Sequence, residues 1–426
     1  MGLSRKQHKR PQTSRIYRHK RSNTPKHKDP PTFEATTGKA AVWGTVVIGR
    51  KLRQVLSLQR NFVLAISRGY RTTATIDAII LSGVLPLNIK IREEAMRARV
   101  GRMGKIEQIE NSTLKHNEYE TKIQYLKSHP AHTGKGINIW PSKIPPPKTD
   151  ITIYTDGTKS EEGVVSAYVI YNKNNEIKTW QTKLEEYNSV FQAELTAIEI
   201  AILNTKDTNH KNITILSDSN SSLQAIKDPS NTSPIVKSIQ RTLQTTKTRY
   251  TMQWIKAHNN TLGNERADTL AKLAVKNEDI PKTKLPKPLS HLKKTLRDIS
   301  IINWQTQWTE EGEGRRLHSY IHKVDLNKNI GDTTLTQFLT GHATTPSYFH
   351  KIGQESSPNC VCGRVGDLDH FSYDCPLTRE IHFKNPGPDK TVQKRMILRE
   401  KGLRNNCRII INFLQSRNRE LCEPAP

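Results

Sequence analysis

The sequence predicts an α/β protein built on a mixed five-stranded sheet flanked by helices, with a helical segment before it and a small helical region after it. Three observations carry this prediction. Residues 150–276 alternate between short strand patterns and amphipathic helical patterns. A proline-containing stretch separates these residues from helical patterns that precede them. A cluster of cysteine and histidine follows near the end of the chain.

The residues before the predicted sheet divide into three segments. Residues 1–39 are rich in lysine and arginine and contain prolines that interrupt helices, so we expect a disordered basic arm. Such an arm would contact phosphates or carry a nuclear import signal, or it is a remnant of an interrupted reading frame. Residues 50–128 repeat apolar side chains at three- and four-residue spacing, which indicates helices. Residues 129–149, which include Pro145–Pro147, are expected to form a linker.

Each element of the central domain, residues 150–276, is predicted by a pattern of its own. The first strand alternates apolar and polar residues, and asparagines between the second and third strands indicate a turn. The expected strands cover residues 151–155, 164–171, 176–183, 212–217 and 250–255, and the expected helices cover residues 189–203, 221–227, 234–245 and 264–275. This order is typical of an α/β layer on a mixed sheet.

The remaining residues form two further regions. After a stretch of prolines and lysines, residues 290–380 return to helical patterns and contain the cysteine and histidine cluster. Residues 381–426 are basic and weakly patterned, and we expect a basic tail there.

The net charge, the cysteines and the apolar runs of the sequence limit the classes of function to consider. Lys and Arg number 67 against 40 Asp and Glu, a formal net charge of +27, which suits a nucleic-acid partner. Three of the five cysteines fall within residues 360–375, which favours metal binding in an intracellular protein over a disulfide framework. The apolar run at residues 40–49 is too short to cross a bilayer. We expect a nuclear location, with the cytoplasm as the alternative.

Four acidic residues stand where an element ends or where an apolar stripe is interrupted. Asp156 and Asp218 each end a strand, and parallel neighbouring strands would place both at one edge of the sheet. Glu194 lies inside the apolar stripe of its helix, and Asp268 lies in the first turns of the last helix. Singly, each has an ordinary role as a turn former, an edge residue, a helix cap or a partner of the helix dipole. Together they favour a divalent-metal site.

The same positions lie in motifs that resemble the type-1 ribonuclease H domain, over about 30% of the chain (residues 150–276). The motifs are Thr155-Asp156-Gly157-Thr158, Val190-Phe191-Gln192-Ala193-Glu194, Leu216-Ser217-Asp218-Ser219, and Trp254-Ile255-Lys256-Ala257-His258 followed by Gly263-Asn264-Glu265-Arg266-Ala267-Asp268. The resemblance implies an endoribonuclease that cuts the RNA strand of RNA–DNA hybrids and leaves 5′-phosphate and 3′-hydroxyl ends. It implies two Mg²⁺ ions, with Mn²⁺ as a substitute, held by Asp156, Glu194, Asp218 and Asp268. His258 would assist product release or proton transfer, and contacts to 2′-hydroxyls would select RNA.

Two departures from the family pattern affect these expectations. Ala257 stands where glycine often precedes the histidine, which would stiffen the loop. Only residues 227–234 separate the two middle helices, so the basic protrusion that some relatives use to hold the hybrid is absent. We expect substrate affinity to come from other parts of the chain.

The cysteine and histidine cluster offers a second metal site. Tetrahedral Zn²⁺ prefers thiolate and imidazole ligands, and the cluster supplies three thiolates and one imidazole from Cys360, Cys362, His370 and Cys375. The alternative is free thiols with a locally packed histidine. The spacing differs from the retroviral zinc knuckle. With Leu339–His342 and Pro376, it resembles the segment that closes the polyproteins of insect-type, jockey-like non-LTR retrotransposons.

The helical residues before the linker resemble another part of the same polyproteins. Residues 59–60, 67–73 and 85–87 resemble the segment that follows the polymerase core, and the chain contains no aromatic-x-Asp-Asp motif. The chain therefore resembles the carboxyl-terminal portion of a reverse transcriptase polyprotein without its polymerase core. A catalytically inactive nucleic-acid-binding remnant is the alternative function. An integrase of related fold is disfavoured, because Glu194 precedes Asp218 in the chain.

Overall fold

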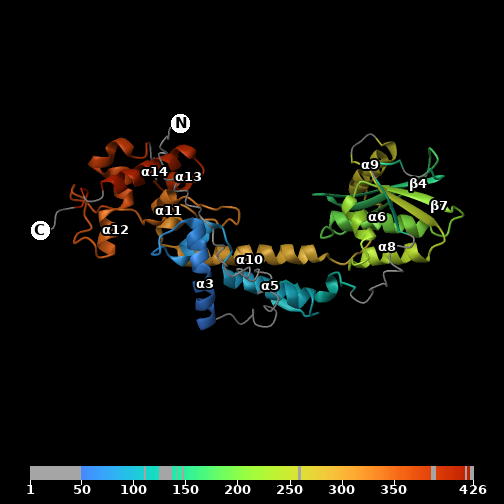
Figure 1. The fold of residues 1–426 in the computed structure, drawn as a ribbon, viewed down its shortest axis with the longest axis horizontal. Helices are drawn as coiled ribbons and strands as arrows, with labels where there is room; N and C mark the ends of the chain where they lie inside the picture. The colour runs from blue at the N-terminus through green and yellow to red at the C-terminus, as the bar shows by residue number, and fades with distance from the viewer. Residues whose placement is uncertain are drawn as a thin grey trace, which may run out of the picture.

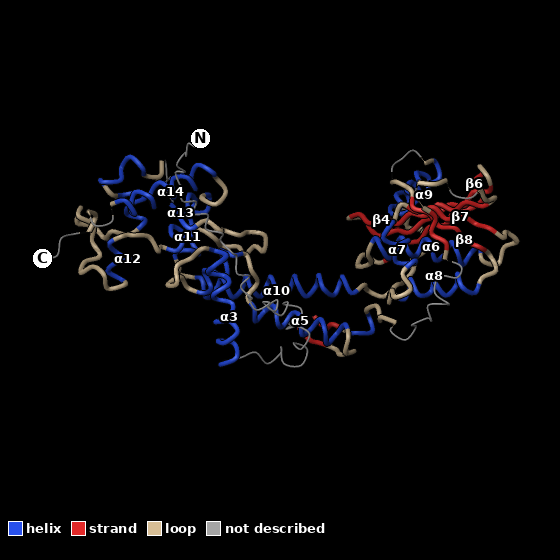
Figure 2. The backbone as a smooth tube through the Cα atoms, in the orientation of Figure 1, coloured by secondary structure: helices blue, strands red, loops and turns tan. Residues whose placement is uncertain are grey.

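The structure is a computed structural model, and it describes residues 49–109, 112–123, 137–141, 143–145, 148–257, 261–384, 390–417 and 420–422. The expected basic arm, most of the expected linker and His258 lie outside these residues. Two lobes rise from a bar formed by the helices α5 (Leu87–Gly101) and α10 (Leu289–Gly312), one lobe containing a sheet and the other helical (Figures 1 and 2).

The sheet lobe has six strands, one more than predicted, in the order β3-β8-β7-β4-β5-β6. The strands are β3 (Asn138–Trp140), β4 (Ile151–Ser160), β5 (Gly163–Asn172), β6 (Asn175–Leu184), β7 (Asn212–Ser217) and β8 (Arg249–Trp254). The first four in this order run parallel, and β4, β5 and β6 form antiparallel pairs. The sixth strand, β3, lies in the segment expected as a linker. Its three residues are too few to show a period, and only pairing with β8 defines it.

Helices cover both faces of this sheet. On one face lie α6 (Val190–Thr205), α7 (Asn220–Lys227) and α8 (Pro234–Thr245), which share a core with Ile151 and Ile153 of β4. On the other face, α9 (Leu262–Lys276) packs its alanines against Val165 and Val169 of β5. The mixed sheet between two helical layers confirms the predicted fold class.

The strand β4 is longer than its sequence pattern indicated. We expected it to end at Asp156, but it continues to Ser160. The neighbouring strand β5 explains the extension, because every residue from Gly157 to Ser160 has a β5 partner in the ladder. Asp156 therefore lies inside an extended strand rather than at its end.

The helical lobe joins segments from both ends of the chain. Its elements include α3 (Gly49–Ser67), α4 (Thr75–Ser82), η3 (Arg316–Ser319), α11 (Thr333–Thr340), α12 (Pro346–Lys351), the π-helical turn η4 (His370–Asp374), η5 (Pro376–Ile381), α13 (Lys390–Met396) and α14 (Lys401–Ser416). The segment expected as a basic tail contains α13 and α14, and α14 buries Cys407, Ile410, Ile411 and Leu414 in this core. Its apolar residues follow a helical spacing, with arginines and asparagines between them.

The long helix α10 takes part in two cores. Leu292 and Leu296 pack with α5, beside the hairpin of β1 (Glu107–Ile109) and β2 (Ser112–Leu114) and near η2 (His116–Glu118). Trp304 and Trp308, further along the same helix, are buried in the core of the helical lobe. Among the described residues, no helix is long and apolar enough to pass through a bilayer.

Candidate active site

Three carboxylates meet at one edge of the sheet. Asp156 lies on β4, Asp218 follows the last residue of β7, and the two strands pair in parallel up to Thr155 and Ser217. Glu194 reaches the same place from the second turn of α6. One oxygen from each of the three carboxylates lies within 4.8 Å of the others. The parallel pairing of β4 with β7 explains the meeting of Asp156 and Asp218, as the sequence suggested.

A glycine permits the approach of Glu194. A Cβ atom built on Gly157 would lie 2.3 Å from the backbone nitrogen of Glu194, so β4 touches the start of α6 here. No side chain larger than hydrogen fits between these two backbones. The cap of α6 fixes its direction, because Ser189 accepts a hydrogen bond from the backbone N–H of Gln192 while the Gln192 side chain accepts one from the N–H of Ser189.

Burial and mutual repulsion perturb the acids. Burial first, and then the charges of Asp218 and Asp268, raise the pKa of Asp156 to about 7. Burial, followed by the charges of Asp156 and Asp218, raises the pKa of Glu194 well above its usual value. Asp156 Oδ2 and Glu194 Oε2 are buried and form no hydrogen bond with the described residues. Two buried oxygens without donors fit a cation ligand better than a purely structural role.

The fourth predicted acid, Asp268, does not join the other three. Its Oδ2 atom lies 2.6 Å from Nζ of Lys272, one helical turn further along α9. The expectation that all four carboxylates converge is therefore met by three of them. Repulsion explains the difference, since the charge of Asp268 already raises the pKa of Asp156 and the Lys272 ammonium offers a neutralising partner.

Asn264 is a site residue to which the sequence analysis gave no role. It is buried at the start of α9, its Nδ2 atom lies 3.5 Å from Asp218 Oδ2, and its Oδ1 atom lacks a hydrogen-bond donor among the described residues. The Trp254 indole N–H donates to the backbone oxygen of Asp218 at 2.9 Å. Its place in the motif Gly263–Asp268, beside the predicted acid, is the sequence signal that could have identified it. His258, the predicted mobile histidine, lies outside the described residues.

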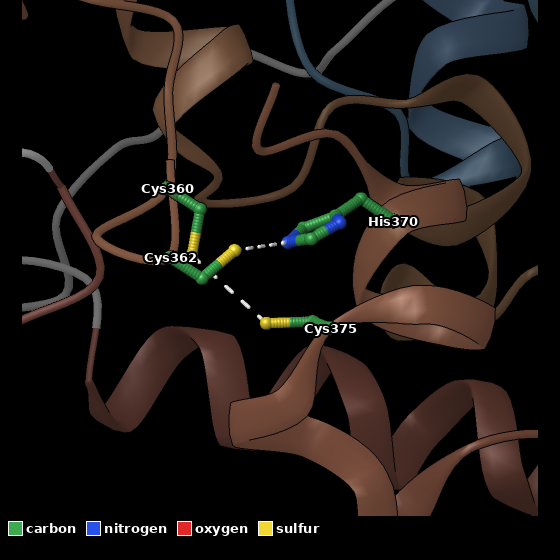
Figure 3. A group of neighbouring side chains, drawn as sticks. All are labelled: Cys360, Cys362, His370 and Cys375. Carbon is green, nitrogen blue, oxygen red and sulfur yellow. Dashed lines mark hydrogen bonds between the residues drawn. The ribbon is translucent and has the colours of Figure 1, made fainter. Parts of the chain in front are cut away.

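The cysteine and histidine cluster forms a second compact group in the helical lobe (Figure 3). One atom of each of its four residues, Cys360, Cys362, His370 and Cys375, lies within 4.8 Å of the others. The sulfurs of Cys360 and Cys375 are 3.9 Å apart, and Cys362 Sγ lies 3.2 Å from His370 Nε2. Burial raises the pKa of the Cys360 thiol to about 12. All four predicted ligands are therefore together. Cys360 and Cys362 lie in a β-bridge and the turn that follows it, His370 begins η4, and Cys375 lies between η4 and η5.

Hydrogen bonds hold the histidine segment in place. The backbone N–H of His370 donates to Asp367 Oδ1 at 2.8 Å. The preceding residue, Asp369, accepts from Arg316 and from Lys394, each at 2.6 Å. These contacts connect the segment that carries His370 to η3 and α13.

A sheet of this topology, with helices on both faces and acids meeting across β4, α6 and β7, defines an α/β domain of the ribonuclease H class. The ribonuclease H family model matches residues 148–276, and the chain carries a ribonuclease H domain there. The match leaves the helical lobe uncovered.

Two curated relatives are similar to parts of this chain. One is the retrovirus-related Pol polyprotein from type-1 retrotransposable element R1 of Bradysia coprophila, 29% identical over 101 residues. The other is the corresponding R1 2 polyprotein of Nasonia vitripennis, 28% identical over 108 residues. The matches cover 22% and 24% of this chain but only 10% and 25% of the relatives, so the chain aligns with a small part of each.

Proposed function

We propose that residues 148–276 hydrolyse the RNA strand of RNA–DNA hybrids, as part of a retrotransposon-derived polyprotein. The observation that carries the proposal is the meeting of Asp156, Glu194 and Asp218, two of them buried with unsatisfied oxygens. The ribonuclease H family match supports this reaction class, and the net charge of +27 supports a polyanionic substrate.

The donor set fits two Mg²⁺ ions. Asp156, Glu194 and Asp218 would hold them, and Asp268 would complete the set after leaving Lys272. When bound, such ions activate the attacking water and stabilise the charge that develops on the leaving oxygen. The raised pKa of Asp156 means that metal binding must displace protons from the acids.

Other residues of the chain would position these groups. Asn264 donates to Asp218 and so fixes the direction of its second oxygen. Gly157 keeps the α6 backbone close enough for Glu194 to reach Asp156. His258 is proposed to transfer a proton or assist release of the product from the loop before α9.

An assay with three substrates tests the proposal. Purified full-length protein is incubated with labelled RNA–DNA hybrid, single-stranded RNA and duplex DNA, with Mg²⁺ or with EDTA. We expect Mg²⁺-dependent cutting of the hybrid alone, lost by at least about a hundredfold in Asp218→Asn. The matched control is Asp279→Asn, which removes one exposed acid just after α9 and should leave cutting unchanged. Hybrid cutting by Asp218→Asn at the wild-type rate would refute the proposal.

A catalytically inactive binding protein is the second candidate. The position of Asp268, paired with Lys272 instead of joining the trio, favours it. The same assay separates the two functions. Tight and salt-sensitive binding of the hybrid without cutting, at any Mg²⁺ concentration, would support the inactive protein.

We further propose that the cysteine and histidine cluster binds one Zn²⁺ ion. Its three sulfurs and one imidazole nitrogen supply the tetrahedral donor set, and they already lie within 4.8 Å of one another. Metal analysis of the full chain should give near one zinc per molecule, reduced in Cys362→Ser. Cys422→Ser is the control, since Cys422 lies outside the cluster; equal loss of zinc in both variants would contradict the assignment.

A further inference from the structure

A cleft of about 800 Å³ lies on the face of the sheet that α9 only partly covers. It runs from the start of α9, at Leu262, to the outer ends of β4 and β5, at Lys148 and Lys173. The helix α9 packs on β5, β6 and part of β4. On this face it leaves Thr152 and Tyr154 of β4 half-buried, while Thr214 and Leu216 of β7 are buried in the floor of the cleft. The proposed reaction uses no residue of this cleft.

None of the three carboxylates lines the cleft, but the cleft begins at Tyr154, two residues from Asp156 along β4. Side chains alternate across a strand, so Thr152 and Tyr154, which line the cleft, share a face of β4 with Asp156. Leu216 of β7 also lines the cleft, and it lies two residues before Asp218 in the chain. From Thr152 to Asp156 an extended strand covers roughly 13 Å. A strand held at the carboxylates would reach this cleft by passing the first turn of α9, where Gly263 packs against the Tyr154 ring.

The lining supplies two kinds of contact that suit an unpaired nucleic acid. The half-buried rings of Tyr154 and Tyr171 form one wall, with centroids 5.8 Å apart and planes at 89°. Lys148 and Lys173 are exposed at the outer end, and with Asp150 they leave one net positive charge. Aromatic rings for bases and ammonium groups for phosphates are the features of single-strand binding grooves.

The position of Lys173 is fixed by its backbone. Its φ angle is 55°, in the left-handed region, and its N–H donates to the backbone oxygen of Asp150 at 2.7 Å. The turn therefore presents the Lys173 side chain at the same end of the cleft as Lys148. No salt bridge to either lysine exists among the described residues.

We propose that this cleft binds an unpaired stretch of RNA that is continuous with the strand held at Asp156, Glu194 and Asp218. The inference rests on the proposed nuclease function for the identity of that strand. Bases would stack on the tyrosine wall, and phosphates would pair with Lys148 and Lys173. The domain would then favour hybrids that carry a single-stranded RNA extension on one side of the duplex.

Binding measurements on the full chain test the proposal. In an Asp218→Asn background, fluorescence anisotropy compares a blunt hybrid with hybrids that carry a short oligouridine RNA extension at either end. We expect one extension to tighten binding about tenfold, the effect of stacking one base. Lys148→Gln with Lys173→Asn should reduce the affinity for the extended hybrid and lower its salt slope by about 1.4, which corresponds to two phosphate contacts on a single strand. Asparagine suits position 173, because it tolerates a positive φ.

A matched control removes the same charge elsewhere. Lys206 and Lys247 line a separate basic cleft of about 470 Å³ at the ends of α6 and α8. Lys206→Gln with Lys247→Gln should keep the gain from the extension. A 4-thiouridine in the extension should crosslink to peptides that contain Tyr154 or Tyr171.

Three results would overturn the proposal. One is equal affinity for blunt and extended hybrids, and another is equal loss in the two double variants. The third is competition by uridine monophosphate at the same cleft with no gain from an extension, which would assign the site to a free nucleotide. Wild-type protein that binds the extension but cuts no hybrid would instead count against the nuclease function alone.

Discussion

Among single residues, Asp156 couples the stability of the fold to pH. Burial and neighbouring acids raise its pKa from 3.8 to about 7, so its ionisation opposes folding. Without metal, the protein should lose stability as pH rises from about 4 to about 7. At about pH 8, the free energy of unfolding of Asp156→Asn should therefore be higher than that of the wild type by up to about 4 kcal/mol. At about pH 5, this difference should be less than half as large. Urea unfolding in EDTA measures the difference.

In the presence of Mg²⁺, the wild type should be more stable than Asp156→Asn. The ions would stabilise the wild type by binding the ionised acids, and Asp156→Asn should gain much less. Asp279→Asn, which changes an exposed acid, should follow the wild type at every pH. Destabilisation of metal-free protein by Asp156→Asn at about pH 8 would show that the carboxylate makes a favourable contact in the fold.

The meeting of acids was predictable at this scale because two strand positions and one helical stripe determine it. Asp156, Glu194 and Asp218 follow from element order and from parallel pairing. The place of Asp268 was not predictable, since it depends on the competition between three acids and Lys272 for its side chain. Sequence patterns report which face a residue occupies, but not which of two charged partners it selects.

Among the elements, α9 packs tightly on β4 close to the site. A Cβ on Gly263 would lie 2.2 Å from the Tyr154 ring, so a side chain there must displace the ring or the helix. Gly263→Ala should cost about 1–3 kcal/mol of stability. It should also reduce hybrid cutting, since the start of α9 carries Asn264 and Asp268. Thermal unfolding and initial rates measure the two effects.

Gly402, in α14, provides the control. Nothing lies within 4 Å of a Cβ built there, so Gly402→Ala should be neutral or should stabilise the helix by up to about 1 kcal/mol. Equal losses in Gly402→Ala and Gly263→Ala would mean that general helix effects, and not the Tyr154 contact, determine the result.

Elements with a pattern of their own were predicted within a few residues. The strand β7 and the helix α8 have the predicted bounds, because β-branched residues mark the strand and the helical spacing of α8 is uninterrupted. The strand β3 was missed, because pairing with β8 rather than its own sequence defines it. The helix α14 was missed, because its apolar stripe lies in a strongly basic segment.

At the scale of the whole molecule, separate cores should unfold separately. The cores on the two faces of the sheet do not share residues with the core of the helical lobe. The helix α10, roughly 36 Å long, spans from the sheet lobe to the helical core. The cysteine and histidine cluster lies in the helical core, with Cys360 and Cys375 fully buried. We therefore expect two thermal transitions, one sensitive to Zn²⁺ and the other to Mg²⁺.

Removal of zinc tests this independence. Chelation, or Cys362→Ser, should lower the free energy of unfolding of the helical lobe by about several kcal/mol, and its transition temperature with it, because zinc binding contributes directly to folding. The fluorescence of the buried Trp304 and Trp308 should report that transition. The rate of cutting of a blunt hybrid, per folded molecule, should stay within about twofold of that of the untreated protein. The elements that position the three carboxylates pack in the core of the sheet lobe, not in the core of the helical lobe. If zinc removal also abolishes the Mg²⁺-sensitive transition, the two lobes fold as one cooperative unit through α10.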